Sequence, residues 1–247
     1  MNEPAIHAEH LQKRYGDTLA VADVSLRVEP GEVLGILGTN GAGKTTTVEM
    51  IAGLRTPDSG QVTVFGLDPR RDRAALRQVL GVQLQKAQLH DTLTVVELVN
   101  LYRSFYPDPR PTDELLDLVE LGSQRRTRFD KLSGGQQQRL SIALALAGRP
   151  RVVILDELTT GLDPRARRRM WTSIESLTEE TVVLVSHAMD EVERLCDRVA
   201  VIDAGRVVAL DTCAGIIRRA GTAGLEDAFV ALTGKELEHE NDEENAA

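Results

Sequence analysis

The sequence has 247 residues, 42% of them hydrophobic, and a formal net charge of −9. A chain of this length can bury a core large enough for one domain, with or without a small subdomain, and needs no stabilising disulfides or metal ions. Its two cysteines lack the spacing of a metal site and indicate a reduced, cytosolic protein. The polar N-terminus predicts no signal peptide, and no stretch approaches the ~18 apolar residues of a membrane-spanning helix, so we expect that the chain does not cross a membrane by itself.

The negative charge is concentrated at the C-terminus. Residues 235–247 carry −5 of the net −9, which leaves −4 on the rest of the chain. We predict that residues 234–247 form an acidic, disordered tail that follows a folded domain over residues 1–233. The nearly balanced charge of this domain argues against a nucleic acid partner, which usually requires a basic face.

Short apolar segments alternate with helical ones along the chain, which is typical of an α/β sheet. The predicted elements, in chain order, are strand 32–38, helix 44–54, strand 61–66, a mostly helical stretch over 92–150, strand 151–157, helix 164–177, strand 181–186, helix 188–196 and a hairpin over 198–210 that turns at Ala204 and Gly205. The part of the helical stretch from 92 to 132 interrupts the alternation and predicts an inserted helical subdomain.

The stretch GTNGAGKTT (residues 38–46) lies between a predicted strand and a predicted helix and fits the pattern of a phosphate-binding loop. Glycines let backbone N–H groups surround phosphates, and the helix N-terminus adds positive potential. We expect Lys44 to bind the β- and γ-phosphates and the Thr45 hydroxyl to bind Mg²⁺. A glycine-rich turn with an incidental lysine is the alternative. The residues predicted to bind the nucleotide here are Gly38, Asn40, Gly41, Gly43, Lys44, Thr45 and Thr46.

Two acidic residues end the predicted strand 151–157. Asp156 is placed to hold Mg²⁺ directly or through water. Glu157, next to it, is a candidate general base for an attacking water. Solvated acids at a strand end are the alternative, which the phosphate-binding loop in the same chain disfavours.

The stretch KLSGGQQQRL (residues 131–140) begins a helix in an unusual way. Ser133 and Gln136 form a capping-box pattern, yet Gly134 and Gly135 between them each cost about 1 kcal/mol relative to alanine in a helix. A first turn without side chains exposes unpaired N–H groups and a partial positive charge to an anion. We therefore predict that these four residues form a second phosphate-binding surface, which closes over a nucleotide held by another copy in a two-fold dimer. A merely flexible N-cap is the alternative.

The motifs GTNGAGKTT, LSGGQQQRL, VVILDE, GLDP and SH, in this order, resemble the nucleotide-binding domain of the ATP-binding cassette (ABC) family over about residues 5–233. The resemblance implies an α/β fold with a P-loop NTPase core, a mixed sheet, an N-terminal antiparallel β region and an inserted α-helical subdomain at about 86–150. It also implies that two such domains enclose two ATP molecules head to tail, with Mg²⁺, and that hydrolysis separates them and drives a membrane partner.

The same resemblance assigns further residues. Tyr15 matches the aromatic that stacks on adenine, although an ordinary strand-edge tyrosine is the alternative. Gln85 matches the glutamine that contacts Mg²⁺ and the attacking water, with Gln83 two residues away as another candidate. Asp163 matches the loop that crosses the dimer interface and also suits an N-cap. His187 matches the histidine that contacts the γ-phosphate. The expected catalytic residues are thus Glu157, His187 and Gln85, and the expected metal ligands are Thr45, Gln85 and Asp156.

Two longer stretches, TVFGLDPRRDRAALRQVLGVQLQ and GLEDAFVALTGKELE, resemble the ATPase subunits of ABC-2 type multidrug and antibiotic exporters. We therefore expect an ATPase that drives a separate integral membrane permease from the inner face of the cell membrane and exports a drug, antibiotic or lipid-like substrate. The resemblance places the permease contact on the subdomain, where Tyr102, Phe105 and Tyr106 form either that contact or the subdomain's core. A soluble cassette ATPase acting on ribosomes or nucleic acid is the alternative, and a non-hydrolysing regulatory binder is a third possibility.

Overall fold

The computed structural model describes residues 3–83, 89–159 and 162–236, and the description that follows concerns these residues. Within them, one nine-stranded mixed sheet has the order β4-β1-β2-β9-β8-β3-β7-β6-β5. The strands are β1 (Ile6–Tyr15), β2 (Thr18–Val28), β3 (Val33–Leu37), β4 (Ser59–Val64), β5 (Leu80–Gln83), β6 (Val152–Asp156), β7 (Thr181–Val185), β8 (Arg198–Asp203) and β9 (Arg206–Asp211). The α-helices are α1 (Lys44–Ile51), α2 (Arg73–Val79), α3 (Val95–Arg103), α4 (Thr112–Leu118), α5 (Gly134–Ala145), α6 (Pro164–Glu175), α7 (Met189–Leu195), α8 (Cys213–Ala220) and α9 (Leu225–Thr233).

One half of the sheet is parallel and positions the candidate site. Strand β3 lies between β7 and β8, β6 lies between β7 and β5, and all of these pairs are parallel. Every residue of β6 and β7 is buried, as is usual for strands covered on both faces. The carboxyl ends of parallel strands meet at one edge, so β3, β5, β6 and β7 end there, and the segments that follow β3, β6 and β7 come together there. The strands predicted at 32–38, 151–157 and 181–186 are confirmed.

The other half of the sheet is antiparallel. Strand β1 pairs with β2 and β4, and β8 pairs with β9. These pairings confirm the N-terminal antiparallel region that the resemblance implies. They also confirm the hairpin predicted over 198–210 and its turn at Ala204 and Gly205.

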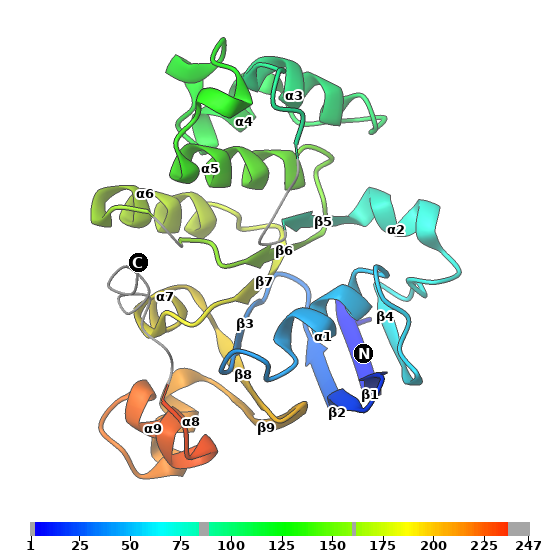
Figure 1. Ribbon diagram of the computed structural model, residues 1–247, viewed down its shortest axis with the longest axis vertical. Coiled ribbons are helices and arrows are strands. Elements are labelled where there is room, and N and C mark those ends of the chain that lie inside the picture. The colour runs from blue at the N-terminus through cyan, green and yellow to red at the C-terminus, as the bar shows by residue number, and fades with distance from the viewer. Residues whose placement is uncertain (1–2, 84–88, 160–161, 237–247) are drawn as a thin grey trace.

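Helices α3, α4 and α5 build the helical part of the molecule. Figure 1 shows α3 and α4 at one end, with α5 between them and the sheet. Helix α3 begins at a capping box formed by Thr94 and Glu97. Buried side chains of these helices join one hydrophobic cluster that continues into β6 and β7, so the helical part packs directly on the sheet. The subdomain boundaries at 86–150 stay a prediction.

Several elements differ from the sequence pattern. The helix predicted over 44–54 ends at Ile51, and the strand predicted over 61–66 ends earlier because Phe65 takes a positive φ of 46°. The pattern alone predicts neither α2 nor the C-terminal helices α8 and α9. These helices are short, and a short helix shows too few turns for its period to stand out.

Within the described ranges, no helix is long and apolar enough to cross a membrane. The chain leaves α9 at Gly234, and the ammonium of Lys235 donates to a carboxylate oxygen of Asp203 at 2.5 Å. Residues 237–247 of the predicted acidic tail lie outside the described residues, so their disorder stays a prediction.

Candidate functional site

The predicted phosphate-binding loop connects β3 to α1 and depends on two glycines in the left-handed region. Gly41 and Gly43 have φ angles of 77° and 103°, which residues with side chains rarely adopt. A Cβ on Gly43 would lie 2.5 Å from the carbonyl oxygen of Ala20, so the loop fits closely against β2. Thr47, which the sequence analysis missed, fixes the loop from α1, because its buried hydroxyl donates to the Gly43 carbonyl at 2.8 Å.

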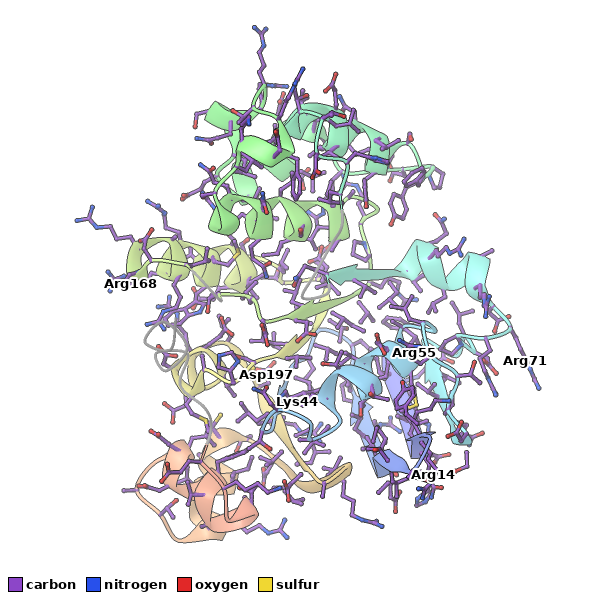
Figure 2. All side chains as sticks on the ribbon, in the orientation of Figure 1. Arg14, Lys44, Arg55, Arg71, Arg168 and Asp197 are labelled. Carbon is purple, nitrogen blue, oxygen red and sulfur yellow. The ribbon has the colours of Figure 1, made fainter. Side chains whose placement is uncertain are left out.

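Lys44 is the first residue of α1, and its ammonium reaches back over the loop. It donates to the carbonyl oxygens of Gly38 at 2.7 Å and of Thr39 at 3.0 Å. These bonds hold the positive charge against the loop, where the N-terminus of α1 adds to the positive potential. Figure 2 shows Lys44 near the middle of the molecule, below the layer of β6 and β7. The other predicted residues of the loop are exposed or half buried: Asn40, Thr45 and Thr46.

Asp156 is the last residue of β6 and is only 3% exposed. Burial and the nearby Glu157 carboxylate raise the pKa of Asp156 to about 6, and the Lys44 ammonium acts against this shift. The lysine of the loop and the carboxylate of the strand therefore lie within electrostatic reach. Gln83, at the end of the adjacent β5, accepts a hydrogen bond from the N–H of Asp156 at 3.1 Å. Gln85, the predicted Mg²⁺ ligand, lies outside the described residues.

The backbone at Glu157 is strained and is held from two sides. Its φ of 54° is uncommon for a residue other than glycine and costs on the order of 1–3 kcal/mol. The N–H of Glu157 donates to the carbonyl of Val185 at 2.9 Å, and the side chain of Gln138 donates to the carbonyl of Glu157, also at 2.9 Å. The next residue, Leu158, is fully buried in the core. Helix α5 therefore helps to orient the proposed base, through a glutamine that the sequence analysis did not single out.

The start of α5 is capped as predicted. Ser133 Oγ accepts from the N–H of Gln136 at 3.3 Å, and Gln136 Oε1 accepts from the N–H of Ser133 at 2.9 Å. Gly134 is exposed and a Cβ there would meet nothing within 4 Å, while Gly135 is half buried. The fold therefore has room for a side chain at position 134. The physical reason for the glycine is that it keeps the backbone N–H groups of the first turn accessible.

The two predicted phosphate surfaces belong to different parts of the chain. In Figure 1, α5 lies with the helical part, whereas α1 begins beside the strands on the other side of β6 and β7. The helix tip and the loop are therefore separate surfaces in one copy of the chain, as the dimer hypothesis requires.

Asp163 and His187 lie at the ends of neighbouring segments. Asp163 caps α6, because its Oδ1 accepts from two N–H groups of the first turn at 2.8 and 3.1 Å. The N-cap interpretation is confirmed, and the role of Asp163 in a dimer stays a prediction. His187 follows β7 and is half buried. The hydroxyl of Ser186 accepts from the N–H of Ala188 at 3.0 Å and closes the turn around His187.

Tyr15 ends β1 and is 41% exposed. The ammonium of Lys13 and the guanidinium of Arg55 lie 5.7 and 5.9 Å from the centre of its ring, within cation–π range. The ring is therefore a solvent-facing platform beside two positive charges. Its stacking on adenine stays a prediction.

The oxygen atoms at this edge of the sheet fit a Mg²⁺ ion that arrives with a nucleotide. Among the described residues, no three His, Cys, Asp or Glu side chains gather into a metal site made of protein groups alone. Mg²⁺ commonly takes one or two protein carboxylates and fills its other positions with phosphate oxygens and water. The Asp156 carboxylate and the Thr45 hydroxyl are donors of this kind. A cation would also stabilise the ionised form of a buried carboxyl whose pKa is raised.

Curated proteins with similar sequences support the motif analysis. Residues 21–160 match the model of the family described as ABC transporter. The chain is 41% identical to Nod factor export ATP-binding protein I of Rhizobium etli, over 83% of this chain and 67% of the relative. It is 34% identical to a linearmycin resistance ATP-binding protein of Bacillus subtilis, over 96% of this chain and 81% of the relative. It is 38% identical to a daunorubicin resistance ATP-binding protein of Streptomyces coeruleorubidus, over 95% and 80%.

Solved structures agree with the fold. The ATP-binding subunit of an ABC transporter superposes with a TM-score of 0.85 at 26% identity, over 92% of this chain and 99% of the other. A dimeric, post-hydrolysis ATP-binding cassette bound to ADP and Pi superposes with a TM-score of 0.77 at 25% identity, over 84% and 98%. These likenesses confirm the predicted α/β fold, with its mixed sheet and antiparallel N-terminal strands.

Replacing Gly134 with alanine separates the needs of the fold from those of the site. Because a Cβ meets nothing there, Gly134→Ala is expected to raise the free energy of unfolding by about 0.5–1 kcal/mol. The methyl group would cover N–H groups of the first turn, so we expect weaker ATP-dependent dimerisation, measured by gel filtration or light scattering. Gly224→Ala, where a Cβ also meets nothing, is the matched control and is expected to leave dimerisation unchanged. Equal dimerisation by both variants would contradict the role of the bare helix tip.

The raised pKa of Asp156 predicts how stability depends on pH. The folded chain keeps the Asp156 proton from the ordinary value of 3.8 up to about 6, so stability falls as the pH rises through this range. Asp156→Asn removes this loss and is expected to raise the free energy of unfolding at pH 8 by about 2–3 kcal/mol. Urea denaturation in EDTA, at pH 4.5 and pH 8, measures the effect. Asp108→Asn, whose side chain is 91% exposed in the parent protein, is the control. A pH-independent effect of Asp156→Asn would contradict the burial argument.

Proposed function

The chain belongs to the ABC transporter family and is one of its ATP-hydrolysing cassettes, and we propose on this premise that it drives export through a separate integral membrane permease. The observation that carries the proposal is the pair of phosphate surfaces, the lysine loop before α1 and the bare tip of α5. A single chain that binds one nucleotide needs only the first of them. The second has a use when two copies face each other and each completes the other's site.

In this proposal the lysine loop binds the nucleotide within one copy. The loop N–H groups and the ammonium of Lys44 contact the phosphates, and the exposed ring of Tyr15 stacks on adenine. The partner copy then places Ser133 and the N–H groups of Gly134 and Gly135 on the γ-phosphate. Asp163 lies at the contact between the two copies and positions the start of α6.

Hydrolysis is assigned to groups at the carboxyl edge of the parallel strands. Glu157 takes a proton from a water whose oxygen attacks the γ-phosphorus, and the bond from that phosphorus to the bridging oxygen breaks to release ADP and phosphate. His187 contacts the γ-phosphate, and Gln85 orients the water. Bound Mg²⁺, held by Thr45, Gln85 and Asp156, would neutralise charge on the phosphates.

Three relatives support export as the direction of transport, since one is named for Nod factor export and two for resistance to antibiotics. We propose the same general class of cargo here, a drug, antibiotic or lipid-like compound, and a position at the inner face of the cell membrane through the permease. The net charge of −9 disfavours the alternative, a soluble cassette acting on ribosomes or nucleic acid, because nucleic acid partners usually require a basic protein surface.

The surface proposed for the permease lies on the helical part. Phe105 is 61% exposed, so the core interpretation is wrong for this residue. Its ring is tilted against that of Tyr102, with 5.8 Å between ring centres. Tyr106 packs inward, because a Cβ on Gly148 would collide with its ring. Both tyrosines line a small open cavity of about 120 Å³, and an apolar helix end of the permease would cover the exposed phenylalanine.

The assignment of the general base predicts a trapped dimer. Glu157→Gln is expected to bind ATP normally and to lower turnover at least ~10²-fold, because the proton acceptor is gone. It is also expected to accumulate as a dimer when ATP and Mg²⁺ are present. Steady-state phosphate release and gel filtration measure the two effects.

Two further variants complete this experiment. Glu179→Gln changes an exposed glutamate and should leave both turnover and oligomeric state as in the parent protein. Ser133→Arg, added to Glu157→Gln, should abolish the ATP-dependent dimer while ATP binding to the monomer is kept. Normal turnover in Glu157→Gln refutes the base, and a persistent dimer in the double variant refutes the second phosphate surface.

Affinity purification from detergent-solubilised membranes tests the permease. We expect the tagged chain to co-purify with one polytopic membrane protein and to reach its highest ATPase rate in that complex. Phe105→Ser should reduce the recovered membrane protein at least ~5-fold and leave ATP binding by the isolated chain unchanged. Recovery of ribosomes in place of a membrane protein would favour the soluble alternative.

A further inference from the structure

A buried carboxylate that the mechanism above does not use lies beside the candidate site. Glu191, in the first turn of α7, is 1% exposed. Trp171 of α6 donates its indole N–H to Glu191 Oε1 at 3.2 Å, and the side chains of Ser186 and Thr159 also hydrogen-bond to Glu191. Figure 1 shows α6 and α7 next to each other, with β7 leading into α7.

This arrangement is costly for the fold. Burial raises the pKa of Glu191, and the three hydrogen bonds act in the opposite direction. An apolar side chain of similar size would fill the same space without the cost of desolvating a carboxyl group. A reason for a carboxylate at this position is therefore sought in its three hydrogen-bond partners, Trp171, Ser186 and Thr159.

Each donor belongs to a segment that leads to a proposed functional residue. The hydroxyl of Ser186 also accepts from the N–H of Ala188 at 3.0 Å, so it closes the turn that carries His187. Thr159 is 9% exposed and lies two positions after Glu157.

Trp171 extends this connection to α6, the helix that Asp163 caps. The guanidinium groups of Arg167 and Arg194 both lie 5.1 Å from the centre of its ring. The indole is thereby fixed between α6 and α7, and its N–H is directed at the carboxylate. Glu191 thus contacts the histidine turn, the segment after the base and the helix at the proposed dimer contact.

We propose that Glu191 is a positioning residue for hydrolysis, which holds the turn of His187 and the segment after Glu157 in one fixed arrangement. The inference rests on the proposed function. A carboxylate suits the position because it is an acceptor at both oxygens, whereas the amide of glutamine presents two N–H donors. With glutamine, amide N–H groups replace one of the two acceptors, so a hydroxyl that faces them has to turn its own hydrogen away and accept, and it no longer donates to residue 191.

Glu191→Gln tests the inference with almost no change in shape. We expect kcat to fall at least ~10-fold, with KM for ATP and the affinity for ATP within about 2-fold of the parent values. Glu193→Gln, an exposed glutamate on the same helix, is the matched control and should change neither. Should Glu191→Gln fail to fold, Thr159→Val removes one hydroxyl donor to Glu191 and should lower kcat at least ~3-fold, again with KM unchanged.

Trp171 is the single tryptophan of the chain, so its fluorescence reports directly on this network. Glu191→Gln should shift its emission, and that shift shows that the network has changed in a folded protein. An emission shift with kcat within 2-fold of the parent overturns the inference. In a His187→Ala background, Glu191→Gln should lower kcat by a smaller factor than in the parent, whereas equal factors would indicate general structural damage and also overturn it.

The parent protein separates the two proposals. If it shows no ATP turnover, alone or in its transporter complex, the proposed function fails. If it turns over ATP normally and Glu191→Gln does too, only the positioning role fails.

Discussion

The candidate site depends on the parallel register of four strands. Because β5, β6, β7 and β3 pair in parallel, these four strands end at one edge of the sheet. The phosphate-binding loop and His187 follow β3 and β7, and Asp156 is the last residue of β6. More than a hundred residues separate the loop from His187. Buried strands fix their register strongly, since a slip of one residue would turn every side chain to the other face.

Several residues of the candidate site reduce the stability of the fold in favour of function. The carboxyl group of Asp156 is buried, which raises its pKa. Glu157 has a positive φ, and Gly134 leaves the tip of α5 without a side chain. Each feature costs on the order of 1–3 kcal/mol or less. A fold offsets such costs with its packed core, here the hydrophobic clusters on the two sides of the parallel strands.

Local patterns were sufficient for much of the fold and the site. The phosphate-binding loop, the capped tip of α5 and the apolar runs of β6 and β7 are signals within a few residues, and they could be predicted. Strand β1 could not be predicted from alternation, because its pairing with β2 is interrupted by register shifts. The roles of Gln138 and Glu191 could not be predicted either. Gln138 bonds to Glu157, 19 residues away, and Glu191 to Trp171, 20 residues away, and only the folded chain brings these pairs together.

The bond from Gln138 to the carbonyl of Glu157 has a mechanical consequence. It is 2.9 Å long, and lengthening it by about 1 Å would break it. A tilt of α5 would therefore either break this bond or displace the backbone carbonyl of Glu157. A force that a neighbouring protein exerts on the outer helices would in this way act on the position of the proposed base, and ATP hydrolysis would respond to the state of that neighbour.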